Sequence, residues 1–212
     1  MPQKRLSCSE RRNQIIQVAM DLFASLGFKG TTTRAIASAA GVSEAIIFRH
    51  FRTKEDLYDA IITTSIEQRT EIWSNEAPDA LDADLPTLMS TYARSFVRQH
   101  REDQTFIRLM LYSSLQDHKF RQRFLESSQL SPLIKQIREK IQSGVDSGDF
   151  LSVDPQLTTM SLFFSLLQYC LSRFVGSPEL PTQEADDAYV DNLIRLYTNS
   201  LQSGVSDPAL TL

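Results

Sequence analysis

The chain has 212 residues, of which 42% are hydrophobic and 23% charged, and its formal net charge is -4, so it can bury a core and is not disordered. Seven glycines and eight prolines make turns scarce, and two cysteines exclude a disulfide framework. Because no apolar run is long enough for a membrane span and the first residues lack a secretory signal, we expect a cytoplasmic protein without a membrane partner.

The first predicted helix lies close to the amino terminus. Apolar residues recur at spacings of three and four along nearly every segment, and no sustained alternation indicates a strand. Ser7 is the expected N-cap of this helix, and Glu10 completes a capping box three residues later. Gly27 is expected to end the helix.

Two short helices and one longer helix are predicted next. The second helix begins behind Thr32 and closes at Gly41, where a residue without a Cβ accepts a left-handed cap. Ser43 is the expected N-cap of the third helix. Thr53 and Asp56 repeat the capping-box pattern and open a longer, connecting helix.

The remainder of the chain is expected to hold five more helices behind a connecting loop at 75–86. They are predicted at about 85–100, from about 103, within 119–144, at about 155–175 and at about 184–203. Pro132 should bend the third of these helices, because proline removes a backbone donor. Pro155 behind Asp154 is a first-turn proline behind a capping residue. The predicted fold class is therefore all-α, with about nine helices.

Residues 31–54 have the pattern of a helix-turn-helix, in which the second helix enters the DNA major groove. The expected inner faces are Ile36, Ala37 and Ala40 in the first helix and Val42, Ile47 and Phe51 in the second. This leaves Ser43, Glu44, Ala45, Ile46, Phe48 and Arg49 pointing outward. An outward Ile46 or Phe48 suits apolar contact with a thymine methyl or a sugar edge; the alternative is that both belong to the core of the small domain.

The charge is distributed unevenly along the chain. Residues 1–54 hold nine of the 22 Lys and Arg but three of the 26 Asp and Glu, so the rest of the chain is strongly acidic. A compact basic segment on an acidic body favours docking of a polyanion at one end. The alternative is an ordinary solvated charged face.

Residue for residue, the basic segment resembles the amino-terminal domain of the TetR family of bacterial transcriptional regulators. The matching residues are Ala19, Phe23, Gly27, Phe28, Thr32, Thr33, Ile36, Ala37, Gly41, Val42, Ser43, Phe48, His50, Phe51, Lys54, Glu55 and Leu57. The resemblance covers about 50 residues, and the rest of the chain matches in layout alone. It implies a homodimer that binds a palindromic double-stranded DNA operator and releases it when a small molecule enters the body.

The resemblance also implies a set of DNA-binding residues: Thr32, Thr33, Arg34, Ser43, Glu44, Ala45, Ile46, Phe48, Arg49, His50 and Lys54. Arg34 would reach a guanine. Glu44, Ala45 and Ile46 would face base edges, and Thr33, His50 and Lys54 would hold phosphates. The chain departs from the family at Ala45, where glycine is usual, and at Phe48, where tyrosine is usual. We therefore expect apolar contact from Phe48.

The domain division expected from this pattern is a DNA-binding domain at 1–54, a connecting helix at about 53–74, and a helical effector-binding and dimerisation domain at 55–212. The helix at 155–175 is apolar nearly all round, so it needs covering on two sides. With the last helix it is expected to form a four-helix dimer interface. Its expected residues are Leu162, Phe163, Leu166, Tyr169, Phe174, Val190, Ile194 and Tyr197.

A small hydrophobic effector is expected to bind inside the body, held by one or two polar groups such as the Tyr92 hydroxyl. The candidate lining residues are Met89, Tyr92, Phe96, Phe106, Met110 and Tyr169. The alternative is that these side chains simply fill the core.

No pattern in the sequence indicates an enzyme, a cofactor or a metal site. The three histidines lack the spacing of ligands, and the neighbouring acids Asp186 and Asp187 are expected to point apart into solvent. The function predicted from the sequence is a ligand-responsive transcriptional repressor. The alternative is a helical small-molecule binding protein without DNA-binding activity.

Overall fold

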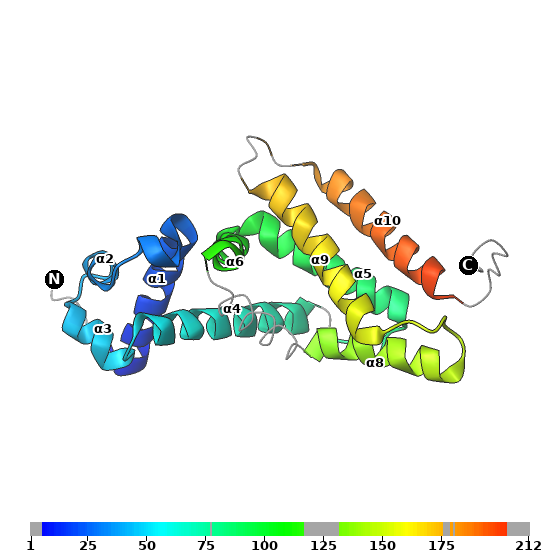
Figure 1. Cartoon of the computed structure of the whole chain (residues 1–212), viewed down its shortest axis with the longest axis horizontal. Coiled ribbons are helices and arrows are strands. Elements are labelled where there is room, and N and C mark those ends of the chain that lie inside the picture. The colour runs from blue at the N-terminus through cyan, green and yellow to red at the C-terminus, as the bar shows by residue number, and fades with distance from the viewer. Residues whose placement is uncertain (1–5, 77, 117–131, 176–178, 180, 203–212) are drawn as a thin grey trace. The chain divides into compact units, whose positions relative to one another are not determined.

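The computed structural model describes residues 6–76, 78–116, 132–175, 179 and 181–202, and these ranges are almost entirely helical (Figure 1). The helices are α1 (Cys8–Gly30), α2 (Thr33–Ala39), α3 (Glu44–His50), α4 (Lys54–Glu76), α5 (Leu85–Glu102), α6 (Thr105–Gln116), α8 (Pro132–Ser147), α9 (Pro155–Phe174) and α10 (Gln183–Leu201). The described β pairing is one isolated bridge between Phe150 and Gln202. The all-α prediction is confirmed.

The chain divides into two compact units. The first contains residues 1–69 and 103–128, and the second contains residues 70–102 and 129–212. The first unit thus extends past residue 54 and includes α6, which packs against α1. Within the described ranges, every helix is too short or too polar to cross a lipid bilayer.

The predicted start of α1 is confirmed. The Ser7 hydroxyl oxygen accepts a hydrogen bond from the Glu10 backbone N–H at 3.2 Å, and the Glu10 carboxylate accepts one from the Ser7 N–H at 2.7 Å. Gly27 interrupts the helix with a φ of 73°, a conformation that costs glycine least, but helical turns resume and the element ends at Gly30. The predicted end at Gly27 is therefore a kink.

The helices α2 and α4 begin at the capping residues that the sequence predicted. Thr32 caps α2 by accepting a hydrogen bond from the Ala35 N–H, and Gly41 follows α2 with a φ of 65°. Thr53 and Asp56 form the reciprocal capping box at the start of α4. Ser43 precedes α3 in extended geometry, but its side chain makes no capping hydrogen bond.

The core of the first unit brings α1, α2, α3 and α4 together. Its most buried side chains are Ile15, Ile16, Phe23, Ile36, Ile47, Leu57, Tyr58 and Ile61. The rings of Phe23, Phe28 and Tyr58 pack on one another with centroids 5.5 to 5.7 Å apart. Burial raises the pKa of Tyr58, which stays protonated in this cluster. This cluster holds α4 against the last turns of α1.

The second unit is built around α5, which packs against α8, α9 and α10. Asp154 caps α9 by accepting a hydrogen bond from the Leu157 N–H at 2.9 Å, and Pro155 occupies the first turn as predicted. Pro132 is the first residue of α8. The expected helix before it, and hence the expected bend, lies at 119–131, outside the described residues.

Candidate nucleic-acid interface

The outward face of α3 carries apolar and cationic side chains. Ile47 and Phe51 are buried in the first unit, whereas Ala45 and Arg49 are exposed and Phe48 is 48% exposed. Phe48 therefore lies outside the core. A helix that buries one side and presents a hydrophobic ring beside a guanidinium on the other has the form needed for reading a DNA groove.

The remaining sequence-predicted residues of the helix-turn-helix surround this face. The exposed ones are Thr32, Arg34 and Ser43, and the half-buried ones are Thr33, Glu44, Ile46, His50 and Lys54. All of them lie on α2, α3, their flanking turns or, for Lys54, the first turn of α4, within the first unit. The structure thus brings the whole predicted set onto neighbouring elements.

Thr33 and Glu44 connect α2 to α3 directly. The Thr33 hydroxyl donates a hydrogen bond to Glu44 Oε2 at 2.8 Å, and each residue is the first of its helix. A hydroxyl has one hydrogen to donate, so Thr33 cannot donate it to a phosphate while this bond exists. The two residues are 11 positions apart, and sequence reasoning did not pair them.

Lys54 is bound inside the first unit. Its Nζ donates hydrogen bonds to the carbonyl oxygens of Phe28 at 2.7 Å and Thr31 at 3.0 Å, and it lies 4.0 Å from the centroid of the Phe28 ring. Burial lowers the pKa of the Lys54 ammonium, while the negative charge of Glu55 acts in the opposite direction. Lys54 thus fastens the start of α4 to the turn between α1 and α2.

Loss of the Lys54 contacts should lower the stability of the folded protein. Lys54→Met removes two charge-assisted hydrogen bonds and a cation–π contact, so we expect the free energy of unfolding to fall by about 2 kcal/mol. Arg52→Met, at an exposed neighbouring position, removes the same charge and serves as the control. Urea denaturation followed by circular dichroism measures both variants; equal losses would show that the charge alone matters and the contacts do not.

Arg12 on α1 adds a cation that sequence reasoning missed. Its guanidinium carbon lies 5.1 Å from the centroid of the Phe51 ring, beside the end of α3. The sequence places an arginine beside the apolar face of the first helix, but it does not show that the partner of this arginine is Phe51, 39 positions away. Among the described residues, no group of three His, Cys, Asp or Glu side chains is placed to hold a metal ion.

The predicted dimer-interface residues divide between the inside and the outside of the second unit. Leu162, Phe163, Leu166, Val190 and Ile194 are buried within the chain, Tyr169 and Tyr197 are half-buried, and the Phe174 side chain lies outside the described set. The exposed apolar surface of α9 and α10 is instead formed by Leu157, Phe164 and Leu196, which are 65%, 43% and 60% exposed.

An open groove of about 740 Å³ runs along this exposed surface of α9 and α10. Phe164, Gln168, Tyr169, Tyr189 and Leu193 are among its lining residues. The rings of Tyr169 and Tyr189 stack at 3.8 Å between centroids. The surface available for covering by another protein is thus continuous and mainly apolar.

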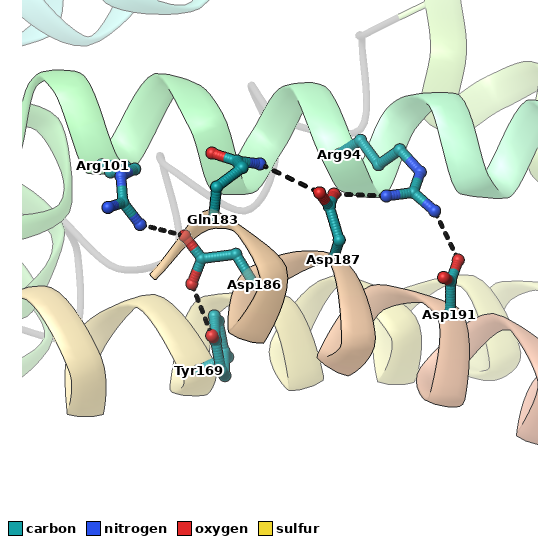
Figure 2. A network of polar contacts seen from close by, with 7 residues as sticks. All are labelled: Arg94, Arg101, Tyr169, Gln183, Asp186, Asp187 and Asp191. Carbon is teal, nitrogen blue, oxygen red and sulfur yellow. Dashed lines mark hydrogen bonds and ion pairs between the residues drawn. The ribbon is translucent and has the colours of Figure 1, made fainter. Parts of the chain in front are cut away.

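A polar network fixes α10 to α5 and α9 beside this groove (Figure 2). Asp186 is 1% exposed and accepts hydrogen bonds from the Arg101 guanidinium and the Tyr169 hydroxyl. Burial, and then the hydrogen bond to Asp186, raise the pKa of Tyr169, so it remains a donor. The expectation that Asp186 points into solvent is wrong, because Arg101 compensates its charge.

The neighbouring acid, Asp187, does point away from Asp186, as predicted. Figure 2 shows Arg94 between Asp187 and Asp191, with one nitrogen of the guanidinium donating to each carboxylate. Gln183 donates to the second oxygen of Asp187 at 3.4 Å. Arg94 and both acids are substantially exposed, so this outer part of the network is solvated.

The candidate ligand residues lie in both units. Phe106 and Met110 are buried on α6 in the first unit, whereas Met89, Tyr92 and Phe96 lie on α5 in the second. The Phe96 ring is 5.9 Å from Tyr92, 5.7 Å from Phe163 and 4.2 Å from His100, between centroids. Burial raises the pKa of Tyr92. The α5 residues thus form part of an aromatic core. Tyr169, the remaining candidate, lines the open groove along α9 and α10.

Comparisons with known proteins agree with the geometry of the first unit. A family model described as bacterial regulatory proteins, tetR family, matches residues 15–61. The chain is 25% identical over 163 residues, 74% of its length and 83% of the relative's, to the uncharacterized HTH-type transcriptional regulator YhgD of Bacillus subtilis. It is 27% identical over 154 residues, 70% of its length and 72% of the relative's, to the HTH-type transcriptional repressor KstR2 of Rhodococcus jostii.

The fold is also similar to a solved structure. FadR, a transcriptional regulator from Bacillus subtilis in complex with stearoyl-CoA, superposes with a TM-score of 0.73 at 17% sequence identity. The match covers 89% of this chain and 98% of FadR. It shows that both units follow the architecture of a known regulator.

Proposed function

We propose that the chain is a member of the TetR family of bacterial transcriptional regulators, and that it is a repressor that binds a palindromic operator as a homodimer and is released by a small hydrophobic effector. The observation that carries the proposal is the outward face of α3, where Ala45, Phe48 and Arg49 stand clear of the core. Two such helices would occupy successive major grooves about 34 Å apart.

We assign the DNA contacts by the chemistry of each side chain. Arg34 suits a guanine, and Ala45, Ile46 and Phe48 suit thymine methyl groups. Thr32, Ser43, Arg49 and His50 suit the flanking phosphates. Thr33 and Lys54 already use donors inside the first unit, so we assign neither to the DNA: Thr33 holds the Glu44 carboxylate, and Lys54 holds the start of α4. Residues 1–54 are the DNA-binding domain in this proposal, and α4 connects them to the body at 55–212.

The exposed face of α9 and α10 is the proposed dimer interface. Leu157, Phe164 and Leu196 would be covered by the same residues of a second copy, as a two-fold axis requires. Tyr169 and Tyr197 would contribute from the edge of that face, while Leu162, Leu166 and Val190 support it from inside. A fixed dimer sets the separation of the two recognition helices.

The proposed effector is apolar and acts in the cytoplasm through the body of the protein. FadR, whose fold is similar, was solved in complex with stearoyl-CoA, and this apolar acyl chain supports the proposal of a hydrophobic effector. Met89, Tyr92 and Phe96 are the proposed effector contacts, and all three lie on α5 in the second unit. Whatever its structure, the effector can weaken DNA binding only by its preference for the DNA-incompetent state.

The test of DNA binding is its dependence on salt. If each protomer contacts about four phosphates, affinity for DNA should fall by about 10⁴-fold between 50 and 200 mM salt, because counterions are released on binding. Fluorescence anisotropy with a labelled duplex from the protein's own upstream region measures this slope. The control is an unrelated duplex of equal length, which should bind more weakly at every salt concentration.

The rival function is that of a helical small-molecule binding protein. It is favoured if micromolar protein gives no salt-sensitive anisotropy change with any duplex from that region. In that case the exposed ring of Phe48 would need another explanation.

A further inference from the structure

We propose that Glu44 selects a cytosine in each half of the operator and that Thr33 is the residue that positions it. This inference rests on the proposed function and deepens it, because it names the base that one residue recognises. It starts from the single acidic side chain of α2 and α3, whose sequences are otherwise neutral or basic.

The position of Glu44 places it near base edges rather than at the rim. It is the first residue of α3, and the amino-terminal residues of a recognition helix are the ones that contact bases. On the outward face it is joined by Ala45 and Phe48, two side chains with no charge to offer a phosphate. Glu44 therefore belongs to the part of the face that would meet the floor of the groove.

The carboxylate is already oriented before DNA arrives. The 2.8 Å hydrogen bond from the Thr33 hydroxyl holds Glu44 Oε2 from the neighbouring helix. This contact leaves Oε1 available to a donor from outside the protein. Because the side chain is held in the half-buried contact between two helices, less rotamer freedom is lost when it binds.

The charge of Glu44 restricts what that outside donor can be. Residues 1–54 contain three acids, and Glu44 is the one on α2 or α3, the two helices that also carry Arg34 and Arg49. A carboxylate is repelled by phosphates, so within a groove it is stable only against a base edge that donates hydrogen bonds.

The donor pattern of the major groove then favours cytosine. Cytosine presents the N4 amino group as a donor, whereas guanine presents two acceptors and thymine presents an acceptor and a methyl group. Adenine offers the N6 amino donor but places the N7 acceptor beside it, which repels the second carboxylate oxygen. A well-formed hydrogen bond from cytosine N4 to Glu44 should raise the affinity for cytosine over the other bases by roughly 5- to 150-fold.

The experiment is selection of bound duplexes from a random pool, followed by sequencing, with wild type and four variants. We expect the wild-type motif to contain one position per half-site at which cytosine is strongly enriched. Glu44→Gln should change the preference at that position to adenine, because a carboxamide pairs with adenine N6 and N7. Arg34→Ala should alter a different position, and the melting temperature of each variant shows that it is folded.

Thr33 is tested by removing and restoring its hydroxyl. Thr33→Val should weaken the preference for cytosine severalfold at the same position and leave other positions unchanged, whereas Thr33→Ser should keep the wild-type preference. A general structural role would instead weaken every position alike. Unchanged cytosine preference in Thr33→Val would overturn the positioning role.

The outcomes separate this inference from the proposed function. If wild type enriches a palindromic motif but Glu44→Gln enriches the same motif at every position, the cytosine assignment is wrong and the repressor proposal stands. If wild type enriches no motif, the proposed function itself fails.

Discussion

Replacing Phe164 by glutamate is expected to convert the protein into a monomer and to weaken operator binding by about 10²- to 10⁴-fold. The Phe164 ring is 43% exposed on α9, next to the apolar groove that a second copy would cover. A carboxylate placed on both sides of a two-fold interface would be buried near its own copy without a compensating cation. Each monomer would then bind one half-site alone and lose the gain of simultaneous binding.

Sedimentation velocity measures the mass, and fluorescence anisotropy measures the affinity for the selected operator. Leu26→Glu is a matched control, because it places the same charge on another exposed apolar residue, 51% exposed on α1 in the first unit. That variant should keep the mass of the wild type. A dimer that survives Phe164→Glu would locate the interface on a different surface.

The sequence predicted the local features of the fold well, because their determinants lie within a few residues. The two capping boxes, Ser7 with Glu10 and Thr53 with Asp56, each join atoms three positions apart, and both are present. The same holds for the Asp154 cap of α9. Helical spacing also predicted most of the burial in the helix-turn-helix: Ile36, Ile47 and Phe51 are buried and Phe48 is exposed, whereas Val42, predicted to point inward, and Ile46, predicted to point outward, are both half-buried.

Contacts between distant residues could not be predicted in this way. Asp186 and Arg101 are 85 positions apart, so the sequence indicated a solvated acid where the structure has a buried one. Periodicity showed that α9 is apolar nearly all round, but it could not tell which side faces its own unit. The structure assigns Leu162 to the inside and Phe164 to the outside.

The candidate ligand residues show the same limit. Phe106 on α6 and Phe96 on α5 are both aromatic residues of the kind that line pockets, but their helices belong to different compact units. The apolar face of α6 is used in packing against α1. Which aromatic residues could share a pocket depends on helix packing, and spacing along one helix carries no information about it.

Asp186→Ala should lower the free energy of unfolding by about 3 kcal/mol. The carboxylate is 1% exposed and satisfies both the Arg101 guanidinium and the Tyr169 hydroxyl. Removing it leaves a partly buried cation and a hydroxyl without their acceptor, which costs more than the net value of the bonds themselves. Arg101 retains some exposure, so water recovers part of the loss.

Urea denaturation of Asp186→Ala, followed by circular dichroism, measures the effect, and Asp191→Ala is the matched control. Asp191 pairs with the same helix through Arg94, but its side chain is 54% exposed, so its removal should cost less than about 1 kcal/mol. Because Tyr169 lines the groove, Asp186→Ala should also weaken dimerisation, whereas Asp191→Ala should not. Equal losses in the two variants would mean that the burial of Asp186 adds nothing to the stability that the network in Figure 2 provides.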